Sequence, residues 1–151
     1  MTYAKGLEGV VAGETSISHV EGEIGRLSYR GIDIKDLVNR DYTEVVALLL
    51  CGDPGQSEAV AKKLAQGALS QSERQCLAAI GTRKHPMKML QAMVPLLDEP
   101  NEIATEEYDE TDHGVGIIAR LPALIATYRQ QQLGNPDPVF DESVDILTNY
   151  L

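Results

Sequence analysis

The first 31 residues carry a β-strand pattern, whereas apolar positions from residue 33 onward follow helix spacing. One β-prone run contains Val10, Val11, Thr15, Ile17 and Val20. The turn-forming residues 21–23 separate it from a second run over residues 26–30, in which Leu27 and Tyr29 alternate with polar side chains. The pattern predicts a β-hairpin within residues 5–31, with one face against a core.

Short helices with start and stop signals are expected over residues 33–151. Asp33 and Asp36 open an amphipathic turn whose apolar positions are Ile34, Leu37 and Val38. A capping box of Asp41 and Glu44 starts a deeply buried helix with its apolar residues at 45–50, which ends at Gly52. A surface helix follows over residues 56–69. Ser70 and Glu73 form the next capping box, and Gly81 closes that short helix.

The second half of the chain predicts three more helices, over residues 86–98, 114–134 and from 141 onward. Pro86 suits a helix start, and Pro95 should kink or end that helix. Its expected buried face contains Met87, Leu90, Val94 and Leu97. The helix over 114–134 is apolar on more than one face and should bend at Pro122. The last helix should bury Val144, Leu147, Tyr150 and Leu151. Its apolar pattern is expected to need a cover at Leu151.

Composition and charge narrow the function. With 43% apolar and 24% charged residues, the 151-residue chain is typical of one globular domain. Its net charge of −10 argues against binding to nucleic acid or to an anionic membrane. No window approaches the roughly 20 apolar residues that cross a bilayer, and no apolar run follows a basic start. These features predict a cytoplasmic protein.

Several residues invite a chemical interpretation, but a structural one is favoured for each. Cys51 and Cys76 lack ligand spacing and are expected to be buried, reduced thiols. His85, just before Pro86, suits a capping or packing role better than a catalytic one. Met87, Met89 and Met93 are expected to fill the core. The acidic run over residues 99–112, next to His113, matches no calcium loop and predicts a solvated connector.

The chain resembles the citrate synthase family in four ordered segments. The first follows a "GL.GVVA.ET.IS...G..GRL.YRG.DI.DL" pattern from Gly6 to Leu37. The others are YTEVVALLLCGDPG, the string His85-Pro86-Met87 ahead of an amphipathic helix, and an "LIA.LP.I.A..YR...G" helix that ends near Gly134. Asn149-Tyr150-Leu151 resembles a further family string. The resemblance implies a mainly α fold: an N-terminal β-hairpin (5–31) followed by packed helices of the citrate synthase large domain (33–151), together a single partial domain over residues 1–151.

The resemblance also implies a reaction, but not a site in this chain. Complete family members condense oxaloacetate with acetyl-CoA, giving citrate and CoA, by means of a catalytic Asp, a catalytic His and arginine clamps on the substrate. Those residues, including the histidine of an "LHADHE" string, fall beyond the position equivalent to Leu151. His19, His85 and His113 stand in no matching catalytic motif, and Glu14, Arg26 and Arg30 have no partner for the condensation. We therefore expect no catalytic, cofactor-binding or metal-binding residue here.

Three interpretations stay open at this point. The chain is the N-terminal segment of a citrate synthase and is inactive alone, or it is the corresponding segment of a 2-methylcitrate synthase that uses propionyl-CoA. Alternatively it is a non-catalytic oligomerisation or regulatory module. As a fragment, as half of a split enzyme or as an independent paralogue, it is expected to associate with itself or with the missing C-terminal half, because apolar helix faces need a cover.

Overall fold

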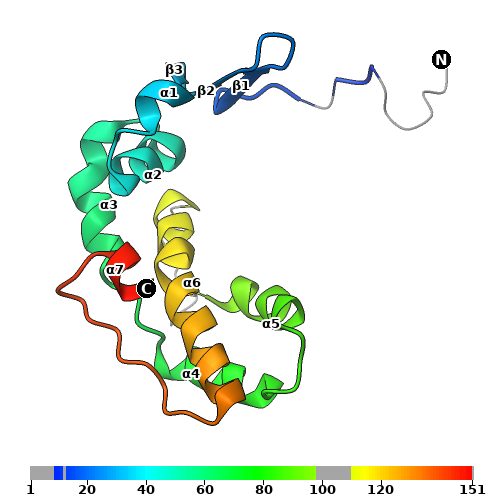
Figure 1. Cartoon of the computed structure of the whole chain (residues 1–151), viewed down its shortest axis with the longest axis vertical. Coiled ribbons are helices and arrows are strands. Elements are labelled where there is room, and N and C mark those ends of the chain that lie inside the picture. The colour runs from blue at the N-terminus through cyan, green and yellow to red at the C-terminus, as the bar shows by residue number, and fades with distance from the viewer. Residues whose placement is uncertain (1–8, 12, 98–109, 151) are drawn as a thin grey trace, which may run out of the picture. The chain divides into compact units, whose positions relative to one another are not determined.

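A computed structural model describes residues 9–11, 13–97 and 110–150. The chain divides into two compact units, Met1–Asp41 and Tyr42–Leu151. The first holds the short strands β1 (Ser18–Glu21), β2 (Arg26–Tyr29) and β3 (Ile32–Asp33) and the helix α1 (Ile34–Leu37). The second holds α2 (Tyr42–Cys51), η2 (Pro54–Gln56), α3 (Ser57–Leu64), α4 (Gln71–Ile80), α5 (Pro86–Met93), η3 (Val94–Leu96), α6 (Glu110–Leu133) and α7 (Ile146–Tyr150). The predicted mainly α fold with an N-terminal hairpin is confirmed (Figure 1).

The N-terminal unit is a three-stranded antiparallel sheet in the order β1-β2-β3. Ser18 pairs with Tyr29 and Glu21 with Arg26. The first strand is shorter than the predicted run, because pairing begins only at Ser18. The third strand was not predicted from the sequence. It follows a reversal in which Arg30 and Gly31 both have positive φ, 48° and 82°, a conformation that glycine adopts without strain and arginine only rarely.

The expectation of one buried hairpin face needs correction. Val20 and Ile24 are largely exposed, while Leu27 and Tyr29 are half-buried. Leu37 in α1 is buried, but the neighbouring Val38 is exposed although it was expected on the apolar side of that turn. Four residues make barely one helical turn, so only one apolar position of α1 faces inward.

Helix ends in the second unit follow the local signals in the sequence. Gly52 ends α2 with φ 75°, and its N–H donates to the carbonyl of Leu48 at 3.1 Å. Ser70 and Glu73 form the predicted capping box of α4, and Gly81 closes that helix. Pro95 ends α5 as predicted, since the chain continues from Met93 as the short 3-10 turn η3.

Two apolar clusters lie along α6, one toward each end. The N-terminal half of α6 packs with α2, α3 and α7 through Val46, Ala47, Val60, Leu64, Val115, Ala119 and Ile146. The C-terminal half packs with α4, α5 and their flanking turns through Leu69, Leu77, Met89, Met93, Leu97, Ala123, Leu124 and Tyr128. The long helix therefore holds the whole unit together, and no described helix is long and apolar enough to span a membrane.

The helix predicted over 56–69 ends at Leu64, because the backbone of the following turn packs directly against the backbone of α6 at Gly67. A Cβ atom at Gly67 would overlap the carbonyl oxygen of Ala119 and would approach the ring Cζ of Phe140 to 2.8 Å. Only a glycine allows the two backbones to come this close. The turn that starts with Ala65 delivers Leu69 to the core instead of continuing the helix.

The predicted buried face of α5 is also wrong in one position. Met87 is 59% exposed, whereas Met89, Met93 and Leu97 are buried. Met89 and Met93 are four residues apart and thus share one face of the helix. The prediction that the methionines fill the core is therefore confirmed for these two. Met87 lies in the first turn, where the chain has not yet reached the core.

Three further expectations are corrected. Cys51 is half-buried and Cys76 is exposed, so the expected burial is wrong for both. Cys76 is exposed because α4 turns Glu73 and Leu77 inward instead. Both cysteines are free thiols, as predicted. The last helix begins at Ile146 rather than near Asp141, and it buries Ile146 while Leu147 and Tyr150 are exposed. Helix α6 begins at Glu110 rather than at Gly114, and Pro122 lies inside it. The bend expected at Pro122 stays a prediction. Most of the predicted acidic connector, as well as Leu151, lies outside the described residues.

Candidate functional site

A buried ion pair joins α4 to α6. Arg120 Nε lies 3.2 Å from Glu73 Oε1, and the two side chains are only 18% and 5% exposed. The other carboxylate oxygen of Glu73 accepts a hydrogen bond from the N–H of Ser70 at 2.6 Å, while Arg120 Nη1 donates to the carbonyl of Gly116 at 3.2 Å. One carboxylate therefore caps α4 and neutralises a cation of α6. Both contacts hold helices in place.

The turn between α4 and α5 is held by α6. The hydroxyl of buried Tyr128 donates to the carbonyl of Lys84 at 2.5 Å, and Gln132 Nε2 donates to the carbonyl of Thr82 at 3.2 Å. At the end of this turn His85 caps α5, because its Nδ1 accepts a hydrogen bond from the N–H of Met87 at 3.2 Å. The capping role predicted for His85 is confirmed.

The histidines stand on three separate elements. His19 lies on the exposed strand β1, where its Nε2 is 3.7 Å from Glu21 Oε1. His113 lies in the first turn of α6 and is partly buried, whereas His85 precedes α5 and is exposed. Across residues 9–11, 13–97 and 110–150, no group of three or more His, Cys, Asp or Glu side chains is arranged to hold a metal ion.

A small hollow lies between α2, α3 and the start of α6. Its volume is about 120 Å³, and its lining includes Cys51, Lys63 and Asp112. Lys63 Nζ forms an ion pair with Asp112 Oδ2 at 2.9 Å. Pockets for drug-sized ligands occupy roughly 300–1,000 Å³, so this hollow has room for a few water molecules only.

The N-terminal unit has a hollow of about 200 Å³ beside the β1–β2 turn, lined in part by Arg26, Asp33 and Lys35. Arg26 lies 3.6 Å from the carboxylate of Glu21 and 3.4 Å from that of Asp33. The N–H of Lys35 bonds to Asp33, and this bond, together with the charges of Lys35 and Arg26, lowers the pKa of the Asp33 carboxyl. Asp33 is therefore ionised, and it also caps α1. Its contacts are structural.

The chain is similar in fold to solved citrate synthases along nearly its whole length. The crystal structure of citrate synthase from Thermotoga maritima matches with a TM-score of 0.80 at 22% identity, covering 99% of this chain and 40% of that chain. Citrate synthase from Pyrobaculum aerophilum matches with a TM-score of 0.76 at 22% identity, covering 96% of this chain and 40% of that chain. At these identities the likeness shows the fold.

Sequence comparison decides the relationship. A citrate synthase from Acidithiobacillus ferridurans is 34% identical over 91% of this chain, and the family model described as "Citrate synthase, C-terminal domain" matches residues 6–151. The chain belongs to the citrate synthase family. The resemblance noted in the sequence is thereby confirmed. The chain spans 38% of the length of the A. ferridurans citrate synthase, so a citrate synthase of that size contains much that has no counterpart in these residues.

Sequence reasoning missed the ion pairs that join distant elements. Glu73 was assigned only a capping role, and its contact with Arg120 has no local signal because the two residues lie on different helices. The same is true of Lys63 with Asp112 and of Arg74 with Asp137, which are 2.9 Å and 3.0 Å apart. That no residue of this chain is catalytic stays a prediction.

Proposed function

We propose that this chain is a segment of a citrate synthase-like acyltransferase that condenses oxaloacetate with acetyl-CoA, and that it supplies scaffold without the active site. The observation that carries the proposal is the mismatch in coverage. The citrate synthase fold accounts for 99% of this chain, yet the chain accounts for only 40% of the T. maritima enzyme.

The polar groups of the described residues support a scaffold role. Condensation requires an acid/base pair around one small substrate and cations that clamp its carboxylates. Here the buried cation Arg120 is neutralised by Glu73, and Lys63 is paired with Asp112. The two hollows of about 120 and 200 Å³ are smaller than pockets that enclose drug-sized ligands, and CoA is larger still.

Two alternatives make different predictions. A 2-methylcitrate synthase segment would have the same scaffold role but would work with propionyl-CoA. The observation that supports a non-catalytic oligomerisation or regulatory module is the exposure of three apolar side chains, Met87, Ile125 and Leu133. Such side chains suit a surface that a partner covers. Homo-oligomer formation, the missing C-terminal half as partner and a cytoplasmic location stay predictions.

The test is complementation. The chain is purified and assayed alone, and then with the remainder of a citrate synthase as a second polypeptide, by following release of CoA thiol in the presence of oxaloacetate. We expect no activity from the chain alone and activity from the mixture. Acetyl-CoA and propionyl-CoA are compared in parallel, which separates the two synthases.

The negative control for complementation is a variant that should not fold. Leu124 is fully buried, so Leu124→Asp should abolish complementation by unfolding the helical unit. Thiol release by the chain alone would refute the claim that the active site is absent. A mixture that binds tightly but stays inactive with both thioesters would favour the non-catalytic module. Size-exclusion chromatography in the same buffers tests the oligomeric state.

A further inference from the structure

The first turn of α5 depends on a single residue, His85. The carbonyl of His85 accepts hydrogen bonds from the N–H groups of Lys88 and Met89, at 2.9 and 3.1 Å. Its side chain accepts a third bond, from the N–H of Met87 to Nδ1 at 3.2 Å. Pro86, the first residue of the helix, has no N–H that needs an acceptor. The N–H groups of residues 87–89 are therefore all bound to His85.

The side-chain bond of this cap requires a neutral imidazole. Nδ1 accepts the N–H of Met87 through its lone pair, so the proton of the neutral ring must be on Nε2. Histidine takes up a second proton near pH 6.5 or about that value, and on this ring the second proton would go to Nδ1 and turn the acceptor into a donor. The imidazolium would also face the positive end of the α5 dipole. Protonation of His85 and this cap therefore exclude each other.

The consequence of protonation falls on the first turn of α5. His85 is exposed, so a protonated ring can rotate into solvent. The backbone before it is held, because the hydroxyl of buried Tyr128 donates to the carbonyl of Lys84. The backbone after it leads to Met89, which is 1% exposed and belongs to the apolar cluster at the C-terminal half of α6. Loss of the cap therefore loosens a turn that holds a core side chain.

The elements around α5 supply no carboxylate for a protonated ring. The ionisable side chains of α4 and of the C-terminal half of α6 are Glu73, Arg74, Cys76, Arg120, Tyr128 and Arg129. Glu73 is engaged by Arg120, and η3 has no ionisable side chain. Within the part of the chain that the structure describes, His85 forms no ion pair with a carboxylate.

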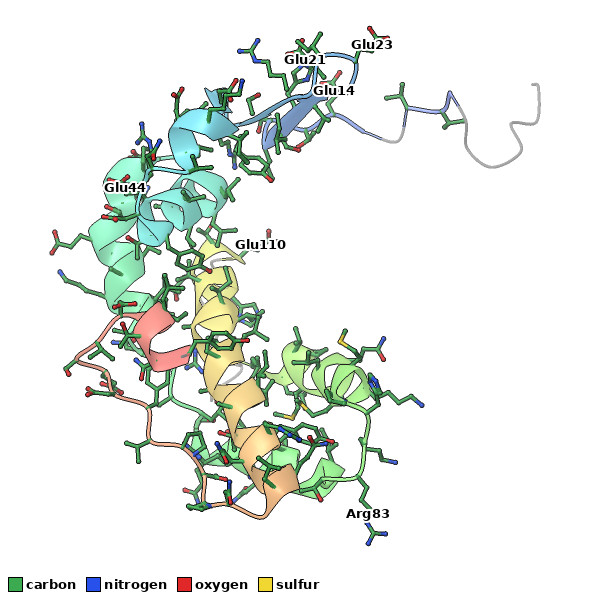
Figure 2. The ribbon with its side chains drawn as sticks, viewed as in Figure 1. Glu14, Glu21, Glu23, Glu44, Arg83 and Glu110 are labelled. Atoms are coloured by element: carbon green, nitrogen blue, oxygen red, sulfur yellow. The ribbon has the colours of Figure 1, made fainter. Side chains whose placement is uncertain are left out.

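The charged residues next to His85 along the chain are all cations, namely Arg83, Lys84 and Lys88. Figure 2 shows Arg83 pointing away from the helices. A positive charge on His85 would therefore add to a cationic stretch instead of being neutralised by it.

We propose that His85 is a pH-sensitive cap of α5. When its imidazole is neutral, Nδ1 binds the N–H of Met87 and the first turn is helical. When the imidazole is protonated, the ring releases that N–H to water and the turn opens. The inference follows from the hydrogen bonds of α5 and does not depend on the proposed function.

NMR of the nitrogen-15-labelled full chain, titrated from pH 8 to pH 5, tests the proposal. At pH 8 the ring-nitrogen shifts of His85 should identify the tautomer with its proton on Nε2. As the pH falls, the amide shift of Met87 and the ring shifts of His85 should change with the same midpoint. The hydrogen-exchange protection of the amides of residues 87–89 should fall roughly fivefold, as expected for the loss of a helix N-cap.

Two variants and a matched control separate titration from a general effect of acid. His85→Asn keeps a side-chain acceptor that does not titrate in this range, so its protection should be equal at pH 8 and pH 5. His85→Ala should be roughly fivefold less protected at both. The control is His19→Asn, which removes an exposed histidine of β1 and should leave the protection loss of residues 87–89 unchanged. Circular dichroism verifies that the variants fold.

Three results would overturn the proposal. The first is a His85 ring at pH 8 with its proton on Nδ1, and the second is a Met87 amide that does not titrate with that ring. Both are measured on the unmodified chain, so they decide the question even if a variant does not fold. The third is an equal loss of protection in His85→Asn and in the unmodified chain, which would assign the pH dependence to other groups.

Discussion

Replacing Glu73 with alanine tests whether the buried ion pair stabilises the helical unit. The change removes the carboxylate that accepts the N–H of Ser70 and leaves Arg120 without the oxygen 3.2 Å from its Nε. Arg120 keeps its bond to the carbonyl of Gly116, but its side chain is only 18% exposed. Its positive charge therefore remains in a poorly solvated position.

The expected cost follows from these contacts. Removing one partner of a buried ion pair typically costs about 3–5 kcal/mol, and the partial exposure of Arg120 favours the lower end of that range. Loss of a helix cap contributes roughly 1 kcal/mol of it. The control is Glu58→Ala, because Glu58 forms an ion pair of 2.8 Å with Lys62 while both side chains are 83% and 74% exposed. Breaking that pair should cost no more than about 0.5 kcal/mol.

Urea unfolding followed by circular dichroism at 222 nm measures both variants, since this signal reports the helices. We expect Glu73→Gln to lie between Glu73→Ala and the unmodified chain, because its amide oxygen still accepts the bond from Ser70. The double variant Glu73→Leu/Arg120→Met should lose less free energy of unfolding than Glu73→Ala, since no charge remains buried. If Glu73→Ala and Glu58→Ala lose equal amounts, the reasoning from burial is wrong.

Three further changes test other contacts. Gly67→Ala should lower the free energy of unfolding by about 1–3 kcal/mol, because its Cβ would overlap the carbonyl of Ala119, whereas Gly13→Ala, with open space around it, should be nearly neutral in the same urea titration. Tyr128→Phe should cost about 1 kcal/mol by leaving the carbonyl of Lys84 without its donor, and an unchanged stability would contradict that contact. The hydroxyl and N–H of Thr148 bond to the Asp145 carboxylate and lower its pKa below the usual 3.8. The cap of α7 is therefore complete above pH 3.8 and is lost as the pH falls through the lowered pKa. NMR shifts of the Thr148 amide between pH 7 and 2 should show this loss, and a midpoint at or above 3.8 would refute it.

Much of the fold was predictable because its signals are local. The Ser70–Glu73 capping box, the stop at Gly52 and the start at Pro86 each depend on hydrogen bonds within one turn, and all are confirmed. The errors occur where a distant element decides the outcome. The sequence around Gly67 does not indicate that the backbone of Ala119 lies against it. Residue spacing alone also does not tell whether Met87 or Met89 is the buried one.

The candidate site was less predictable for the same reason. Arg120 lies in an apolar helix, and only the folded chain shows that Glu73 neutralises it. By contrast, the capping role of His85 could be predicted, because its acceptor and donor are two residues apart.

The position of α6 in the chain has a consequence for synthesis. Both apolar clusters need side chains of α6, which spans Glu110–Leu133, while most of their other members come from residues 46–97. At roughly 5–20 residues per second, on the order of ten seconds separate translation of the start of α2 from that of the end of α6. During that interval the inward faces of α2 to α5 have only one another to pack on, because the α6 side chains of both clusters are absent. The helical unit therefore completes its two clusters only after α6 has been synthesised.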